Sequence, residues 1–171
     1  AGPSNVVAMD AYIKFMRIGL SAGFNSNSYL QAISAAVLTN EDVAVGISYS
    51  GSTRDTVEAL SIARKAGATT VAITNFSDMP ISDASDIVIC TKADESLFQG
   101  GAMASRTAQL AVIDLIFAGT VSRTADVFAE QFDKTKTALL MKLRGAAGVP
   151  GQAGRNGRAS APHRGEHDTK Q

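Results

Sequence analysis

The chain has 171 residues, of which 45% are hydrophobic and 19% are charged, as is typical of a globular protein with one domain. Its sixteen basic and sixteen acidic residues balance, which excludes binding to nucleic acid through an overall positive charge. The single cysteine, Cys90, excludes an internal disulfide and a cysteine-built zinc site, and it favours a reducing, cytoplasmic location. The longest apolar stretch, residues 108–119, contains Asp114 and is too short to span a membrane.

The composition changes near Arg144. Residues 144–171 contain six glycines, two prolines and one large aliphatic residue, Val149. They carry five basic and two acidic residues, whereas residues 1–143 carry 11 basic and 14 acidic residues. A segment so poor in apolar side chains cannot offset the backbone entropy that it would lose on folding. We therefore expect one domain over residues 1–143 and a disordered tail over residues 144–171.

Helical and strand patterns alternate within the expected domain. The predicted helices have apolar residues at spacings of three and four, or high apolar content, and cover residues 6–20, 28–38, 54–66, 102–117 and 124–143. The predicted strands are short, nearly continuous apolar runs at residues 42–48, 69–74 and 87–91. A loop is expected over residues 75–85, and Gly67 is expected to end the third helix. This alternation predicts a parallel sheet between two helical layers, a three-layer α/β/α sandwich.

The six residues SYSGST at positions 48–53 lie between a predicted strand and the following helix. Ligands of open α/β sheets bind beyond the carboxyl ends of the strands, and the N-terminus of a helix offers free N–H groups that suit a phosphate. Gly51 allows the backbone to come close to such an anion. The alternative is that Ser52 or Thr53 only caps the helix, with Asp55 at the third position after Ser52. Four hydroxyl side chains around one glycine are more than a single helix cap needs.

The run GISYSGST at 46–53, with ARKAGA at 63–68 and VAIT at 71–74, resembles the core of a sugar isomerase (SIS) domain. The residues GPS at 2–4 resemble the first loop of this family. The run AMASRTAQLAVID at 102–114 is similar to the ligand-sensing domain of RpiR-type transcriptional regulators. The resemblance implies a flavodoxin-like fold with a mainly parallel sheet. In the family a helix and a strand precede the first loop, so we expect both to be missing from this chain.

The resemblance also implies a binding site for the phosphate of a phosphorylated sugar or amino sugar. Its expected ligand-binding residues are Ser4, Ser48, Tyr49, Ser50, Gly51, Ser52, Thr53 and Glu95. Hydroxyl groups and backbone amides of the 48–53 loop would hold the phosphate, and Ser4 would contact the sugar or its phosphate. The side chain of Tyr49 either lines the pocket or packs beneath it. Arg106 matches the regulator pattern and would pair with a ligand anion or with a carboxylate across a subunit interface.

Two functions remain open. The first is a phosphosugar-binding effector domain of an RpiR-type regulator, which needs no catalysis. Both histidines, His163 and His167, lie in the expected tail, so the expected domain has no histidine for proton transfer. The second is a phosphosugar isomerase or lyase of the SIS family that uses Glu95 as its base.

Few further partners are expected. No cofactor is implied, and the acidic residues of the 75–86 region are too widely spaced along a loop to suggest a metal site. DNA would be contacted only through a helix-turn-helix domain that lies outside these 171 residues. The helix predicted over residues 102–117 is apolar on most sides, which favours a homodimer or a homotetramer.

Overall fold

The computed structural model describes residues 2, 4–94, 103–123 and 125–147. The chain divides into two units, residues 1–136 and residues 137–171, and the second unit contains the C-terminal part of helix α6 (Ala125–Ala147). Within the described residues, no helix is long and apolar enough to cross a membrane. Helix α6 continues to Ala147, so the expected start of the disordered tail at Arg144 was wrong, and residues 148–171 lie outside the described part, where the disordered tail stays a prediction. The sheet and the site described below belong to the first unit.

Among the described residues, three parallel strands form the sheet, in the order β1 (Val43–Ser48), β2 (Thr69–Thr74) and β3 (Ile87–Cys90). The register pairs Val43 with Thr69 at the start of β1, and Ser48 with Thr74 at its end. The central strand β2 is buried on both faces of the sheet. Ala72 and Ile73, which lie on its opposite faces, are completely buried. All three strands were predicted from their apolar runs, and all three are confirmed.

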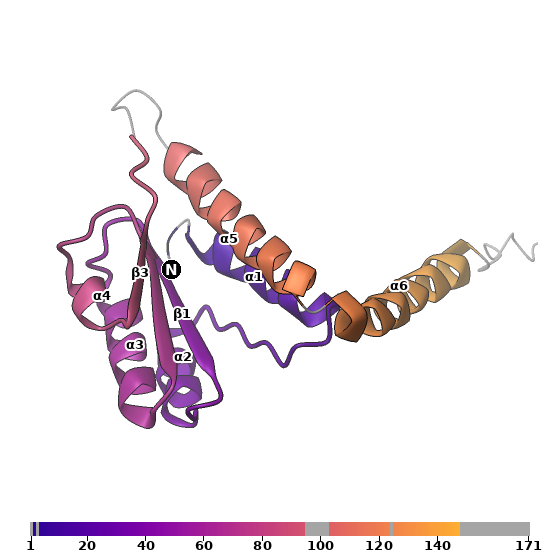
Figure 1. The fold of residues 1–171 in the computed structure, drawn as a ribbon, viewed down its shortest axis with the longest axis horizontal. Helices are drawn as coiled ribbons and strands as arrows, with labels where there is room; N and C mark the ends of the chain where they lie inside the picture. Colours follow the sequence, from indigo (N-terminus) through magenta and orange to yellow (C-terminus); the bar gives the residue numbers. More distant parts are fainter. Residues whose placement is uncertain (1, 3, 95–102, 124, 148–171) are drawn as a thin grey trace, which may run out of the picture. The chain divides into compact units, whose positions relative to one another are not determined.

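Helices α1 (Ser4–Arg17) and α5 (Met103–Arg123) lie side by side on one face of the sheet (Figure 1). Val7 of α1 and Ile113 of α5 pack there against Ile47 and Ile73 of the sheet. The ammonium group of Lys14 on α1 forms ion pairs with Asp10 in its own helix and with Asp114 of α5. Apolar packing and one ion pair therefore join two helices that lie a hundred residues apart in the chain.

The other face of the sheet is covered by α3 (Arg54–Ala66), with α2 (Ser28–Ala36) packed beside it and the short α4 (Pro80–Asp83) near its start (Figure 1). Leu60 of α3 packs on Ala72 and Ile81. The helix comes very close to β1, since a Cβ atom built on Gly46 would lie 2.4 Å from Cδ1 of Leu60. A side chain at position 46 would therefore displace the buried side chain of Leu60 from its place against the sheet.

The three-layer α/β/α arrangement with a parallel sheet is confirmed. The backbone of Gly67 has a φ of 103°, and its N–H group bonds the carbonyl oxygens of Ala63 and Arg64, so the expected end of α3 is also confirmed. Other expectations were wrong in detail. The 75–85 region contains the single turn of α4 in addition to a loop, and α5 extends six residues beyond its predicted end at Phe117.

Candidate functional site

A pocket of about 240 Å³ lies at the carboxyl end of β1. Its walls come from the start of α1, the residues around the start of α2, and the loop that leads from β1 into α3. The lining residues are Gly2, Ser4, Asn5, Ser26, Ser28, Gln31, Ile47, Ser48, Tyr49, Ser50, Thr53, Asp55 and Thr56. Residues at or next to the first turns of α1, α2 and α3 are thus brought to one place, and the N-terminus of a helix carries partial positive charge.

The hydroxyl group of Ser48 organises the loop between β1 and α3. It lies 2.8 Å from the hydroxyl of Thr53, and it accepts a hydrogen bond from the backbone N–H of Gly51 at 3.2 Å. Thr53 occupies the N-cap position of α3, yet among the described residues its side chain makes no capping hydrogen bond. The interpretation of Thr53 as a helix cap is therefore wrong, and its hydroxyl belongs to the loop.

Gly51 fixes the path of this loop. Its φ is +66°, a left-handed conformation that favours glycine, and a Cβ atom there would lie 2.6 Å from Cβ of Met79. The carbonyl oxygen of Gly51 accepts a hydrogen bond from the N–H of Ile81 at 3.0 Å, and that of Tyr49 accepts one from the N–H of Asn75 at 3.1 Å. The loop is therefore held by the residues that follow β2.

The backbone of the loop keeps donors available for a ligand. Within the described residues, no hydrogen bond is made by the N–H groups of Ser50 and Thr53. The hydroxyl of Ser50 accepts hydrogen bonds from the N–H and the hydroxyl of Ser52, at 3.3 and 3.0 Å. Free N–H groups beside several hydroxyls form a neutral set of donors of the kind that binds an anion at the start of a helix.

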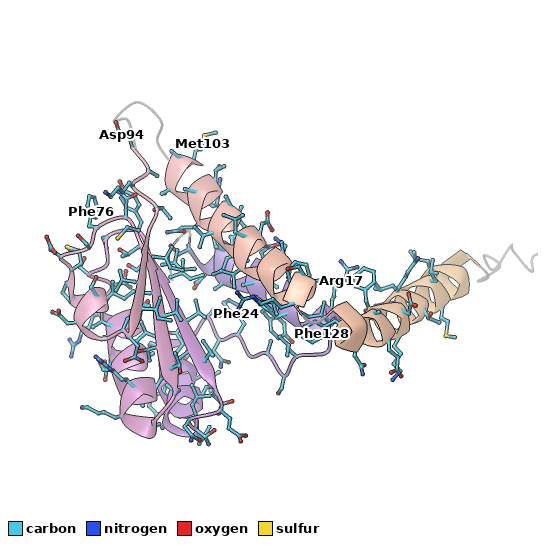
Figure 2. The ribbon with its side chains drawn as sticks, viewed as in Figure 1. Arg17, Phe24, Phe76, Asp94, Met103 and Phe128 are labelled. Atoms are coloured by element: carbon cyan, nitrogen blue, oxygen red, sulfur yellow. The ribbon has the colours of Figure 1, made fainter. Side chains whose placement is uncertain are left out.

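Tyr49 lies at the pocket and next to a second aromatic residue. It lines the pocket, and its ring also packs edge-on against the ring of Phe76, with the two centroids 5.7 Å apart. Phe76 lies at the same end of the sheet as Asp94 (Figure 2). The pair of rings therefore forms an apolar boundary next to the polar loop.

Ser4, at the start of α1, lies on the wall of the pocket formed by the N-terminal residues. Its hydroxyl donates a hydrogen bond to Oε1 of Gln109 on α5, at 3.4 Å. Although Ser4 and Ser48 are 44 positions apart in the sequence, both line this one pocket. The first loop and the 48–53 loop are therefore neighbours in space.

The other expected residues are distributed as follows. Ser50 and Thr53 line the pocket with Ser4, Ser48 and Tyr49, whereas Gly51 is buried in the loop and Ser52 is exposed. Glu95 lies in the segment 95–102, outside the described residues. Arg106 is half-buried in the first part of α5. His163 and His167 also lie outside the described residues.

The sequence interpretation missed the polar wall contributed by Asn5, Ser26, Ser28 and Gln31. A local signal for part of it existed in the run NSNS at 25–28. Asn27 caps α2, because its Oδ1 accepts hydrogen bonds from the N–H groups of Tyr29 and Leu30. An N-cap predicts the start of a helix, but only the tertiary fold brings that start beside the 48–53 loop.

Charge is sparse at the site. Among the lining residues, all of them described, Asp55 alone carries a formal charge, and its position in the first turn of α3 is favourable for a carboxylate. Across the described chain, no three His, Cys, Asp or Glu side chains are grouped in a way that could hold a metal ion. The pocket therefore presents hydroxyls, amides and one carboxylate, groups that both donate and accept hydrogen bonds, which suits a polyhydroxylated ligand.

Comparison with known proteins agrees with this geometry. The family profile of the SIS domain matches residues 1–119. An uncharacterized HTH-type transcriptional regulator of Caldanaerobacter subterraneus is 41% identical over 139 residues, which are 81% of this chain and 49% of that protein. The chain thus spans about half the length of this curated relative.

Solved structures of other proteins resemble the fold, and two of them are compared below. The Vibrio vulnificus NanR protein complexed with ManNAc-6P has a TM-score of 0.75 and 25% identity, over 82% of this chain and 53% of that chain. The sugar isomerase domain of the RpiR transcription factor from Sphaerobacter thermophilus has a TM-score of 0.65, over 78% of this chain and 73% of that chain, and its 22% identity supports the fold alone. By its match to the family profile over residues 1–119, this chain belongs to the SIS domain family.

Proposed function

We propose that this chain binds a phosphorylated sugar or amino sugar and serves as the effector domain of an RpiR-type transcriptional regulator. The observation that carries the proposal is the contact of 2.8 Å between the hydroxyls of Ser48 and Thr53, together with the absence of a side-chain cap on α3 among the described residues. The helix therefore begins with N–H groups that an anion can occupy. The 41% identical regulator and the NanR structure with ManNAc-6P support the same function.

In this proposal the phosphate oxygens accept hydrogen bonds from the hydroxyls of Ser48, Ser50 and Thr53 and from the backbone around Gly51 and Ser52. Ser4 contacts the sugar or its phosphate from the opposite wall. The donors are neutral, so the favourable potential comes from the start of α3 and from the oriented amides. A site of this kind discriminates a phosphorylated sugar from a free sugar, because the free sugar leaves these donors without an acceptor.

Regulation would follow from differential binding. A ligand that prefers one arrangement of a homodimer or homotetramer shifts the population toward it, and the DNA-binding domains of the full-length regulator follow. Exposed apolar side chains support self-association. On α1 they recur at spacings of three and four, at Val6, Met9, Ile13 and Met16, and on α5 Leu115 is 73% exposed. Light scattering coupled to size-exclusion chromatography measures the oligomeric state, and a monomer at all concentrations would contradict the proposed self-association.

The proposed regulator function also implies a cytoplasmic protein.

The first test is thermal unfolding of the chain with ManNAc-6P and with a panel of hexose, pentose and other amino-sugar phosphates, each beside its free sugar. At a concentration of 100 times Kd, a ligand that binds only the folded state stabilises it by about 2.7 kcal/mol. We expect one phosphorylated sugar to raise the melting temperature and its free sugar to leave it unchanged. A cooperative transition that no phosphorylated sugar shifts would contradict the proposal.

A second measurement separates a sensor from an enzyme. We expect Glu95→Gln to retain most of the affinity for the sugar phosphate, since a sensor needs no base at this position. Aldose–ketose interconversion and elimination are followed by NMR with the wild-type chain and the variant. Turnover by the wild type that Glu95→Gln abolishes would replace the sensor with an isomerase or a lyase.

A further inference from the structure

Gln109 is the most deeply buried amide side chain at the interface between α5 and α1. It is 1% exposed and belongs to the buried face of α5, together with Ser105 and Ile113. Val7 of α1 and Ile113 of α5 contribute to the same apolar cluster. A leucine or a methionine would fill this position without the cost of burying a polar group. A glutamine at this buried position is therefore expected to make a hydrogen bond that matters for structure or function.

The hydrogen bonds of Gln109 are incomplete. Its Oε1 accepts the hydroxyl hydrogen of Ser4 at 3.4 Å, a long distance for an O–H···O hydrogen bond. Its Nε2 is buried and has no hydrogen-bond partner among the described residues. A buried donor without a partner destabilises a protein more than a weak hydrogen bond stabilises it. With Oε1 directed to Ser4, the amide group is therefore in its less favourable orientation.

Rotation of the amide by 180° exchanges the positions of Oε1 and Nε2 with little change in shape. In the rotated form Nε2 donates to the hydroxyl oxygen of Ser4. The hydrogen of the Ser4 hydroxyl is then released from Gln109 and can be donated into the pocket that Ser4 lines. The atom left without a partner is now an acceptor, which is tolerated better in protein interiors than a lone N–H donor.

We propose that Gln109 is a positioning residue that acts through Ser4: in the rotated orientation its amide donates to Ser4 and directs the Ser4 hydroxyl to an oxygen atom of the sugar phosphate. This inference rests on the proposed phosphosugar site and extends it to α5, a helix that contributes no side chain to the lining of the pocket. The occupied pocket is thereby linked by one hydrogen bond to the interior of the α1–α5 layer.

The test is a double-mutant cycle with Ser4→Ala, Gln109→Met and the double variant, measured as Kd by calorimetric titration with the sugar phosphate that shifts the wild-type melting temperature, ManNAc-6P being tried first. We expect Gln109→Met to weaken binding by about five- to tenfold, the effect of one lost hydrogen bond. Its melting temperature without ligand is expected not to fall, because methionine fills the same volume and removes the unpaired donor. In the Ser4→Ala background, Gln109→Met is expected to cause no further loss, since the residue acts through Ser4.

Ile113→Val is the matched control, one turn further along the same buried face of α5. We expect it to lower the melting temperature and to leave Kd unchanged. Gln109→Leu provides a second apolar substitution should Gln109→Met fold poorly. Wild-type affinity in a folded Gln109 variant would overturn the inference, as would losses that multiply in the double variant. If the wild type binds no sugar phosphate, both the proposed function and the proposed role of Gln109 are wrong. Binding by the wild type with an additive cycle overturns the role of Gln109 alone.

Discussion

The carboxylate of Asp86 accepts two hydrogen bonds from Thr70, one from its backbone N–H and one from its hydroxyl, each at 2.8 Å. These bonds join the residue that precedes β3 to the start of β2. Together with Arg64, whose Nε lies 3.0 Å from Oδ1 of Asp86, they hold the pKa of Asp86 below its ordinary value of 3.8. One exposed carboxylate thus ties two neighbouring strands and α3 together.

The lowered pKa of Asp86 gives a prediction with a definite sign. A carboxyl group with a lower pKa in the folded state stabilises the fold above its unfolded pKa, and this stabilisation is lost as the pH falls through the folded value. We expect Asp86→Asn to unfold at a lower urea concentration at pH 7, and the difference from the wild type to shrink below about pH 4. Asp78→Asn, in the exposed loop after β2, is the control. An equal effect of both variants at pH 7 would contradict the prediction.

Gly46 is predicted to be intolerant of any side chain. In Gly46→Ala the new Cβ meets Cδ1 of Leu60 at 2.4 Å, and Leu60 is 3% exposed within a packed cluster. Overpacking of this kind destabilises a core by about 1–3 kcal/mol. Urea unfolding measures the change in free energy. Gly23→Ala is the matched control, because no atom lies within 4 Å of its Cβ position, and its stability is expected to stay near that of the wild type.

Thr53 tests the anion site against helix capping. Since its hydroxyl bonds Ser48, we expect Thr53→Val to lower the unfolding free energy by about 1 kcal/mol and to weaken binding of a sugar phosphate about tenfold or more. A residue that only caps the helix would lose a similar free energy, about 1 kcal/mol, but its loss would leave the affinity unchanged. Thr53→Ser keeps the hydroxyl and is expected to restore most of the affinity. Titration calorimetry and urea unfolding of the same samples distinguish the two outcomes.

Lys14 contributes a stabilisation of the fold that is lost at alkaline pH. Partial burial lowers its pKa, but the ion pairs with Asp10 and Asp114 outweigh burial and raise the pKa above its ordinary value of 10.5. The stabilisation is therefore complete below the unfolded pKa and is lost as the pH rises through the folded one. We expect Lys14→Met to remove this loss between about pH 10 and pH 12. At pH 7 the variant should lose less than about 1 kcal/mol, because Asp114 is largely exposed. Unfolding curves across that pH range measure it, and an unchanged alkaline dependence would contradict the role of Lys14.

The sequence was sufficient for the order of elements because the buried strands and Gly67 leave local signals. It was not sufficient for the direction of the Thr53 hydroxyl, since a threonine before a helix has the same local pattern whether it caps the helix or bonds Ser48. The contribution of Gln31 and Asn5 to the pocket depends on which helices begin at the end of β1. Such convergence arises from tertiary packing, and no spacing within one segment encodes it.

The missing side-chain cap on α3 among the described residues has a consequence for folding. If the phosphate of the ligand supplies the hydrogen-bond acceptors for the first turn, the ligand takes the place of the N-terminal cap of the helix. Occupancy would then slow exchange of amide hydrogens at the start of α3, from Arg54 onward, and leave those of β2 unaffected. The first turn of α3 would then both bind the phosphate and become more stable when the phosphate is bound.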